Sequence, residues 1–294
     1  MNWTRWRNRI VKVRTHPRPV RFLLSRALWL TRLAPLFTTD LPGQLKVRFY
    51  PSSISAALWV SHDARNDDVE FLRLVLRPGD CYLDCGANVG HLAVVARSIV
   101  GETGAVTAIE ANPRIFSYCV GNLRLNGYDD VLSLNVALGE LRGTVQITDR
   151  RDDDQNRVGD GDAIVPMRPL DEVVGAIDVR LLKLDVEGYE LQVLRGARGV
   201  LARTDIVYCE LSASNSERFG YRPSDAEQLL LDAGFVLARR VGTGWALARR
   251  GVYETLTAAE RPSTGYNLVA IRRGALPLVE ARFAEGGEPL ERVD

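Results

Sequence analysis

The chain has 294 residues, a formal net charge of +1 and 46% hydrophobic residues, so it is long enough for one large domain with appendages. Its near-neutral charge points to no particular class of partner, and nucleic acid in particular is not favoured. The cysteines, at positions 81, 85, 119 and 209, have no zinc spacing and lie apart from the histidines. We interpret them as reduced, buried thiols in a cytoplasmic protein.

Charge is concentrated at the start of the chain, where nine Arg or Lys residues and no acid precede Asp40. We predict a basic, partly helical extension over residues 1–44. Arg26 and Arg32 interrupt the apolar stretch from Phe22 to Phe37, which excludes a signal peptide and makes a membrane span poor. The favoured interpretation is packing on its own domain or in a homodimer. The alternative is peripheral contact of residues 1–37 with the inner membrane surface, through an apolar stripe of Phe22, Leu23, Trp29, Leu30 and Leu33.

Short apolar runs alternate with helical segments from residue 45 onward. Strands are predicted at 45–50, 81–85, 105–110, 131–136, 181–186, 206–211 and 266–272, and helices at 69–76, 90–99, 113–126, 189–197 and 224–233, the last capped by Ser224. This alternation predicts an α/β domain over residues 45–273 with a mostly parallel, doubly wound sheet. Residues 138–169 interrupt the rhythm with two strand-like pieces and a polar loop at 149–162, either a lid or a surface insertion. Residues 274–294 are predicted to be a polar, loosely held tail.

The most informative motif is Tyr82-Leu83-Asp84-Cys85-Gly86-Ala87-Asn88-Val89-Gly90, followed by Ala108-Ile109-Glu110-Ala111-Asn112-Pro113. Each apolar run ends in an acid at the carboxyl edge of the predicted sheet, where such folds bind small molecules. Gly86 and Gly90 allow a sharp turn and a close approach of the backbone to a ligand. The carboxylate of Glu110 can accept hydrogen bonds from both ribose hydroxyls of a nucleoside. Asp84 is expected to hold the turn or to meet an ammonium group on the ligand.

A nicotinamide dinucleotide site is the competing interpretation of this turn. Counted from Gly86, that fingerprint requires glycines at positions 88 and 91, which are Asn88 and His91 in this chain. The pyrophosphate would therefore lack its close approach to the helix N-terminus. A nucleoside cofactor without phosphates fits better, and S-adenosylmethionine is the common one.

A second motif, Lys183-Leu184-Asp185-Val186-Glu187-Gly188-Tyr189-Glu190, places three charges on one face of a predicted central strand. Such strands are normally apolar on both sides, so the charges must be paired or must border a polar cavity. Lys183 either serves the chemistry or only neutralises the acids. Asp185 is expected to face the same cavity as Gly86. Glu210, near the end of the next strand, is expected to share this rim or to pair with Lys183.

Together with Leu170-Asp171-Glu172, these motifs resemble the FkbM-type methyltransferases over about residues 65–240. The resemblance implies the class I methyltransferase (Rossmann-like) sheet, S-adenosylmethionine as cofactor, and usually O-methylation of a sugar, a glycolipid or a natural product. It implies that the cofactor is bordered by the two motif loops and by the end of the third strand, at Asp84, Gly86, Ala87, Asn88, Gly90, Glu110, Ala111, Asn112, Asn135, Val136, Ala137 and Asp185. Cys85 departs from the usual branched aliphatic residue.

Methylation of a hydroxyl requires a general base. Asp185 is the nearest carboxylate by this argument, with Glu187 and Glu210 as substitutes and His62 as a loop residue that can line the acceptor pocket. A divalent cation held by the clustered acids is the less favoured alternative, and no metal ligands are assigned. A non-catalytic, cofactor-binding protein docked through its basic N-terminus is a further alternative to the O-methyltransferase, alongside the NAD-type oxidoreductase.

Overall fold

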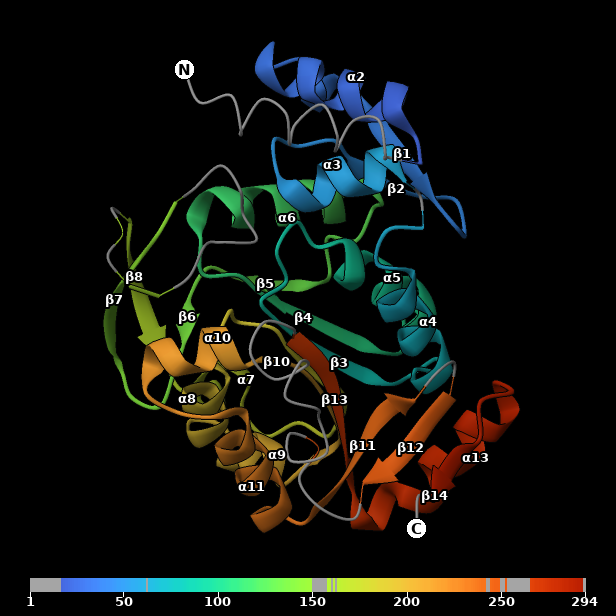
Figure 1. Ribbon diagram of the computed structural model, residues 1–294, viewed down its shortest axis with the longest axis vertical. Coiled ribbons are helices and arrows are strands. Elements are labelled where there is room, and N and C mark those ends of the chain that lie inside the picture. Colours follow the sequence, from blue (N-terminus) through green and yellow to red (C-terminus); the bar gives the residue numbers. More distant parts are fainter. Residues whose placement is uncertain are drawn as a thin grey trace.

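The computed structural model describes residues 17–61, 63–149, 158–159, 161, 163–241, 244–248, 252 and 265–292. A central sheet dominates these residues (Figure 1). Its strands run in the order β14-β12-β11-β13-β10-β9-β3-β4-β5. Their bounds are β3 Cys81–Cys85, β4 Ala105–Ile109, β5 Leu132–Leu134, β9 Val179–Leu184, β10 Thr204–Ser212, β11 Phe235–Val241, β12 Gly244–Ala248, β13 Gly265–Arg272 and β14 Leu290–Arg292.

The strands β5, β4, β3, β9 and β10 are parallel to one another, with β5 at the edge of the sheet. Strand β13 pairs antiparallel with both β10 and β11. The predicted mostly parallel sheet of the class I methyltransferase fold is therefore confirmed. From β3 the chain moves outward through β4 and β5 and then returns to β9 on the other side of β3. This reversal of strand order opens a crevice at the carboxyl ends of β3 and β9, where doubly wound sheets bind ligands.

Helices cover both faces of the sheet (Figure 1). One layer contains α4 Asn66–Val75, α5 His91–Val100, α6 Pro113–Leu125 and α13 Leu276–Glu285, and the other contains α7 Leu170–Val174, α8 Glu190–Arg195, α9 Arg198–Leu201 and α11 Pro223–Asp232. Successive strand residues alternate between the two cores, so Leu181 packs in the first and Leu182 in the second. Burial on both faces explains why these strands are continuously apolar.

The N-terminal elements form a separate layer beside α6 (Figure 1). They are α2 Pro19–Leu30, η1 Ala34–Leu36, the hairpin of β1 Thr38–Leu41 and β2 Leu45–Arg48, and α3 Ser53–Val60, which packs on α2. The predicted apolar stripe does not act as one unit: Trp29 is buried, whereas Leu23, Leu30 and Leu33 are exposed. The helix turns these residues to different sides. No helix in the described part of the chain has the length and apolarity needed to cross a membrane.

The interruption of the rhythm forms a small sheet in the order β6-β8-β7. β6 Ala137–Leu138 and β7 Gly143–Ile147 are the two predicted pieces, joined by the predicted turn, and β8 Ala163–Arg168 was not predicted. Most of the polar loop at 149–162 lies outside the described residues. The short elements α10 Ala213–Ser216, η3 Glu217–Phe219 and η4 Arg273–Ala275 complete the fold.

The structure corrects two expectations at helix ends and at the tail. Helix α11 begins at Pro223, so Ser224 does not cap it; the Asp225 carboxylate instead accepts the Arg222 backbone N–H at 2.7 Å. The tail is not loosely held, because Val279 and Phe283 of α13 are fully buried and β14 pairs with β12. The tail is polar overall, but Val279 and Phe283 recur at helical spacing and complete the core beside α4.

Candidate active site

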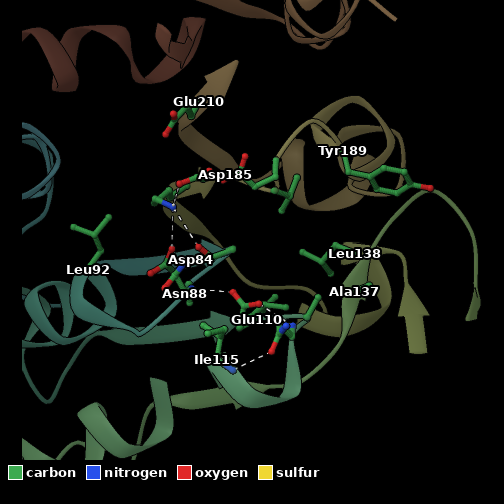
Figure 2. Close-up of a pocket in the computed structure, with 18 of the residues that line it drawn as sticks. Asp84, Asn88, Leu92, Glu110, Ile115, Ala137, Leu138, Asp185, Tyr189 and Glu210 are labelled. Atoms are coloured by element: carbon green, nitrogen blue, oxygen red, sulfur yellow. Dashed lines mark hydrogen bonds and ion pairs between the residues drawn. The ribbon is translucent and has the colours of Figure 1, made fainter. Parts of the chain in front are cut away.

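A cavity of about 350 Å³ lies at the carboxyl ends of β3, β4 and β9, at the reversal of strand order (Figure 2). Asp185 and Glu210 lie on one side of it, Glu110 on another, and Ala137, Leu138 and Tyr189 on a third (Figure 2). The structure brings most of the predicted site residues to this cavity: Asp84, Gly86, Ala87, Asn88, Glu110, Ala111, Asn112, Val136, Ala137, Lys183, Asp185, Glu187 and Glu210 line it.

Glu110 follows the last residue of β4, and the backbone fixes the orientation of its carboxylate. Oε2 accepts the backbone N–H of Asn88 at 2.9 Å, and Oε1 accepts that of Asn112 at 2.8 Å. Asn112 in turn caps α6, because its Oδ1 accepts the N–H groups of Arg114 and Ile115. A carboxylate oxygen can accept more than one hydrogen bond. Glu110 is therefore a preorganised acceptor that can receive a pair of neighbouring hydroxyls.

The two motif glycines make room for protein rather than for ligand. Gly86 has φ +84°, and a Cβ there would collide with the backbone carbonyl of Asp185. Gly90 has φ +77°, and a Cβ there would lie 2.6 Å from the Cys119 Sγ. Gly86 borders the cavity, but Gly90 does not. The predicted sharp turn is confirmed, and its close approaches are to the loop after β9 and to α6.

Asn135 also lies behind the cavity wall rather than on it. Its side-chain amide donates to the carbonyl oxygens of Glu110 and Ala111, at 2.8 and 2.9 Å. It connects the end of β5 to the end of β4. The next residues, Val136 and Ala137, form an apolar wall of the cavity. Asn135 thus supports the cavity from behind its wall.

Lys183 connects the two central strands. Its buried Nζ lies 3.6 Å from Asp84 Oδ1, 3.3 Å from Asp185 Oδ2 and 3.5 Å from the Gly86 carbonyl oxygen. Burial alone would lower the pKa of Lys183, but Asp185 and Asp84 outweigh it and raise that pKa. Lys183 therefore remains an ammonium and cannot act as a base. The ammonium group expected beside Asp84 is supplied by the protein.

Arg65 is the main site residue that the motifs did not indicate. It precedes α4 in the left-handed conformation (φ 65°, ψ 24°) and points its guanidinium at three acids. It lies 2.9 Å from Asp68, 3.2 Å from Asp185 and 3.8 Å from Glu210. A non-glycine residue holds such a backbone conformation only where its surroundings enforce it, as at functional sites. This cation, and not Lys183, is the one paired with Glu210.

Asp185 and Glu210 are neighbours because β9 and β10 are in register, with Leu184 opposite Cys209. Burial opposes the charge on Asp185, but Lys183 and Arg65 outweigh it and lower the pKa of Asp185. The negative charge of Asp185, with a further contribution from burial, raises the pKa of Glu210 to about 7. The pair thus divides into a permanent anion and a carboxyl that titrates near neutrality, which suits a general base.

Glu187 does not share a strand face with Lys183 and Asp185, as the spacing had suggested. β9 ends at Leu184, and Glu187 has φ 55°, so it belongs to the turn that leads into α8. Its Oε2 accepts a hydrogen bond from the Asn215 amide at 3.0 Å. Glu187 lines the cavity on the side of α10. Because it belongs to a turn, the alternation of side chains along a strand does not predict this position.

His62, the histidine considered for the acceptor pocket, lies outside the described residues. His91 is buried at the start of α5 and lines the cavity. Burial and the charges of Arg65 and Lys183 lower its pKa to about 3, so its ring is neutral and weakly basic. Within the described part of the chain, neither ring nitrogen has a hydrogen-bond partner. His91 is therefore suited to contact a ligand and not to transfer a proton.

A second cavity, of about 330 Å³, adjoins the first across Arg65 and Glu210. Its other lining residues are polar with the exception of Gly265: Asp63, Asn66, Asp67, Asp68, Tyr266 and Asn267. Such a lining suits a ligand rich in hydrogen-bonding groups. Among the residues that the structure describes, no group of three or more His, Cys, Asp or Glu is arranged to hold a metal ion. At the shared rim, the counter-charges of the acids are Arg65 and Lys183.

Comparisons with known proteins agree with this geometry. A family model described as the methyltransferase FkbM domain matches residues 84–237. The hexuronic acid methyltransferase AglP of Haloferax volcanii is 28% identical over 196 residues, which cover 63% of this chain and 76% of that protein. Among solved structures, the methyltransferase FkbM from Methylobacillus flagellatus KT is similar with a TM-score of 0.42 and 17% identity, covering 74% of this chain and 53% of that one. A SAM dependent methyltransferase from Aquifex aeolicus has a TM-score of 0.42 and 14% identity, covering 76% and 97%. Because the family match extends over more than half of its length, the chain belongs to the FkbM methyltransferase family.

Proposed function

We propose that this methyltransferase uses S-adenosylmethionine to methylate a hydroxyl group of a neutral sugar, whether free, lipid-linked or part of a natural product. The observation that carries the proposal is the position of Glu110. Its carboxylate is fixed at the end of β4 and faces the cavity, with the charged cluster of Asp185 and Glu210 on another side (Figure 2). A nucleoside held at Glu110 has its reactive end within the same cavity as a base.

The lining of the first cavity fits this cofactor. Glu110 is suited to the two ribose hydroxyls. The cavity also has an apolar wall that suits a flat nucleobase. It consists of residues that follow β5 or belong to β6 and β7, namely Val136, Ala137, Leu138 and Ile147. The cofactor would supply a methyl group activated by its bond to a sulfonium sulfur, and the thioether would leave as the acceptor oxygen bonds to the methyl carbon.

Glu210 is the proposed general base. Its pKa of about 7 gives a substantial carboxylate fraction at neutral pH and enough basicity to accept a proton. Glu210 takes the proton that the acceptor hydroxyl loses as its oxygen is methylated. Asp185, whose pKa is lowered, serves instead to hold Lys183 and Arg65 and to keep the pKa of Glu210 high. Arg65 steadies Glu210 from 3.8 Å.

The acceptor is assigned to the second cavity, which meets the first at Arg65 and Glu210. Four carboxylates and one guanidinium line it, and Arg18 and Arg240 lie 3.8 Å from two of these acids, Asp63 and Asp67. The acids still outnumber the cations, which disfavours an anionic ligand and offers acceptors for hydroxyl groups. A neutral sugar satisfies both conditions. The similarity to a hexuronic acid methyltransferase supports a sugar acceptor in general. The acidic lining favours a neutral sugar over a uronate.

The test is incubation of the full chain with methyl-labelled S-adenosylmethionine and fractionated lipids and polysaccharides of the host, followed by mass analysis. Label in a neutral sugar, retained after mild alkali, is expected, because an ether survives alkali and a carboxyl ester does not. Alkali-labile label would identify a uronate ester and overturn the proposed acceptor. Label in protein or RNA, or no heat of cofactor binding by calorimetry, would overturn the function itself.

A further inference from the structure

Helix α2 has apolar residues on two opposite sides. Ser25 and Trp29 face the protein and are buried. At 3.6 residues per turn, the opposite side carries Val20, Leu23, Leu24 and Leu30, which we call the outer face of α2. These four side chains are 68%, 52%, 50% and 75% exposed. A helix that only packed on its own domain would carry polar residues there.

Further exposed apolar residues follow the helix in the chain. The next large apolar residues in the chain, Leu33, Leu36 and Phe37, are also exposed, and they lie in and around η1. The layer of α2 and α3 forms one end of the molecule, away from the helices on the opposite face of the sheet (Figure 1). Clustered exposed apolar residues mark an interaction surface, whereas scattered ones are ordinary.

The charged residues of this stretch of the chain are of one sign, and one of them, Arg18, lies 3.8 Å from Asp63. No Asp or Glu precedes Asp40, and the described residues carry Arg18, Arg21, Arg26 and Arg32 in this stretch. The Arg26 guanidinium lies over the rings of Phe22 and Trp29, at 5.4 and 5.7 Å, on the flank of the helix. Long basic side chains at the margin of an apolar face are the pattern of a helix that lies in a bilayer interface.

We propose that the outer face of α2 docks on an anionic bilayer, with its leucines among the acyl chains and its arginines at the headgroups. The sign of the charge favours this occupant. A second copy of the chain would bring a second basic segment against the first, whereas phosphate headgroups neutralise it. The inference does not depend on the proposed reaction, because it uses no residue of either cavity.

The test is flotation of the full-length protein with phosphatidylcholine vesicles, with and without phosphatidylglycerol. Binding is expected only with phosphatidylglycerol, and raised salt should weaken it. The double variant Leu23→Glu/Leu30→Glu should lower the partition coefficient at least about tenfold, because two apolar side chains lose their burial and two charges repel the headgroups. The matched control is Leu141→Glu/Leu278→Glu, which changes two exposed leucines elsewhere and should bind as wild type.

Three results would overturn the proposal: no binding by the wild type, equal binding by the two double variants, or a dimer in sedimentation that Leu23→Glu/Leu30→Glu dissociates. The last would assign the face to a second copy. Thermal unfolding of each variant shows that its fold is intact, since all four positions are exposed.

Discussion

Asp185 directly follows β9 and Glu210 lies in β10, each one residue past the paired Leu184 and Cys209, and the charge of Asp185 is the main reason that the pKa of Glu210 rises to about 7. Two cations, Lys183 and Arg65, keep Asp185 ionised, so the proton that the pair can exchange belongs to Glu210. The site therefore contains one carboxylate, Asp185, that stays ionised and raises the pKa of its neighbour, and one, Glu210, that titrates near neutral pH.

We expect activity to depend on the ionisation of Glu210. Because the carboxylate form is the base, kcat/KM should rise tenfold per pH unit below about pH 7 and level off above it. Glu210→Gln should lower kcat by about 10²–10⁴-fold and abolish this limb. Glu187→Gln is the control, since Glu187 lines the same cavity and contacts Asn215. A pH limb that survives Glu210→Gln would assign the base elsewhere.

Glu110→Gln should weaken binding of S-adenosylmethionine. The variant replaces a charged acceptor, and hydrogen bonds to charged groups contribute about 1.5–3 kcal/mol each, so a loss of affinity of about 10- to 100-fold is expected. Isothermal calorimetry measures it directly. Glu102→Gln, at an exposed position, should bind as wild type. Unchanged affinity in Glu110→Gln would remove Glu110 from the cofactor site.

Replacing Lys183 should destabilise the fold as well as the site. Lys183→Met leaves Asp84 without its buried cation and leaves Asp185 with Arg65 alone, and breaking a buried ion pair from one side costs about 3–5 kcal/mol. Urea denaturation measures the free energy of unfolding. The double variant Lys183→Met/Asp84→Asn should recover part of the loss, because it removes the carboxyl group that Lys183→Met leaves without a cation. Equal stability of the two variants would show that Asp84 does not depend on Lys183.

Two glycines with similar backbone angles separate conformational strain from collision. Gly43 has φ +89° and open space around it. The free energy of unfolding of Gly43→Ala should therefore fall only by the cost of the left-handed conformation, about 1–2 kcal/mol. Gly86→Ala, at φ +84°, carries the same penalty and also drives a Cβ into the Asp185 carbonyl. Its unfolding free energy should fall further, and its affinity for S-adenosylmethionine should fall with it. Equal effects at the two positions would contradict the close contact of the β3 and β9 loops.

The C-terminal helix should contribute to the core. Phe283→Ala removes a fully buried ring that contacts Phe71 and Trp245, and such truncations cost about 3–5 kcal/mol. Leu278→Ala, on the exposed side of the same helix, should have little effect. Thermal or urea unfolding distinguishes them. Similar stabilities would mean that α13 is not part of the cooperative unit.

The sequence sufficed where a site residue directly follows its own strand. Gly86, Glu110 and Asp185 each come at or just after a strand end, and parallel strands bring their carboxyl ends to one edge of the sheet. It did not suffice for Arg65 or Tyr266, which lie far from the motifs in sequence and reach the site only because α4 and β13 pack beside β10. Such neighbours follow from tertiary packing, which no local pattern encodes.

Periodicity also left open which side of a helix is covered. In α2, apolar residues occur on both sides, so counting them predicted one packed stripe, whereas Trp29 is buried and Leu30 is exposed. In α13, polar residues outnumber the buried ones, so composition suggested a loose tail. In both helices the outcome was decided by the surface available on the rest of the fold, and not by the helix itself.

Helix α3 separates the outer helix from the interior: α2 packs on one part of it, while its Ile54 lines the cofactor cavity. A single helix, α3, therefore connects α2 with the cavity wall. Thermodynamic linkage makes any influence of one on the other reciprocal. If the outer face of α2 docks on a bilayer as proposed, any factor by which the bilayer changes the affinity for the nucleoside is also the factor by which a bound nucleoside changes adsorption, and the cofactor concentration would then affect how much protein is adsorbed.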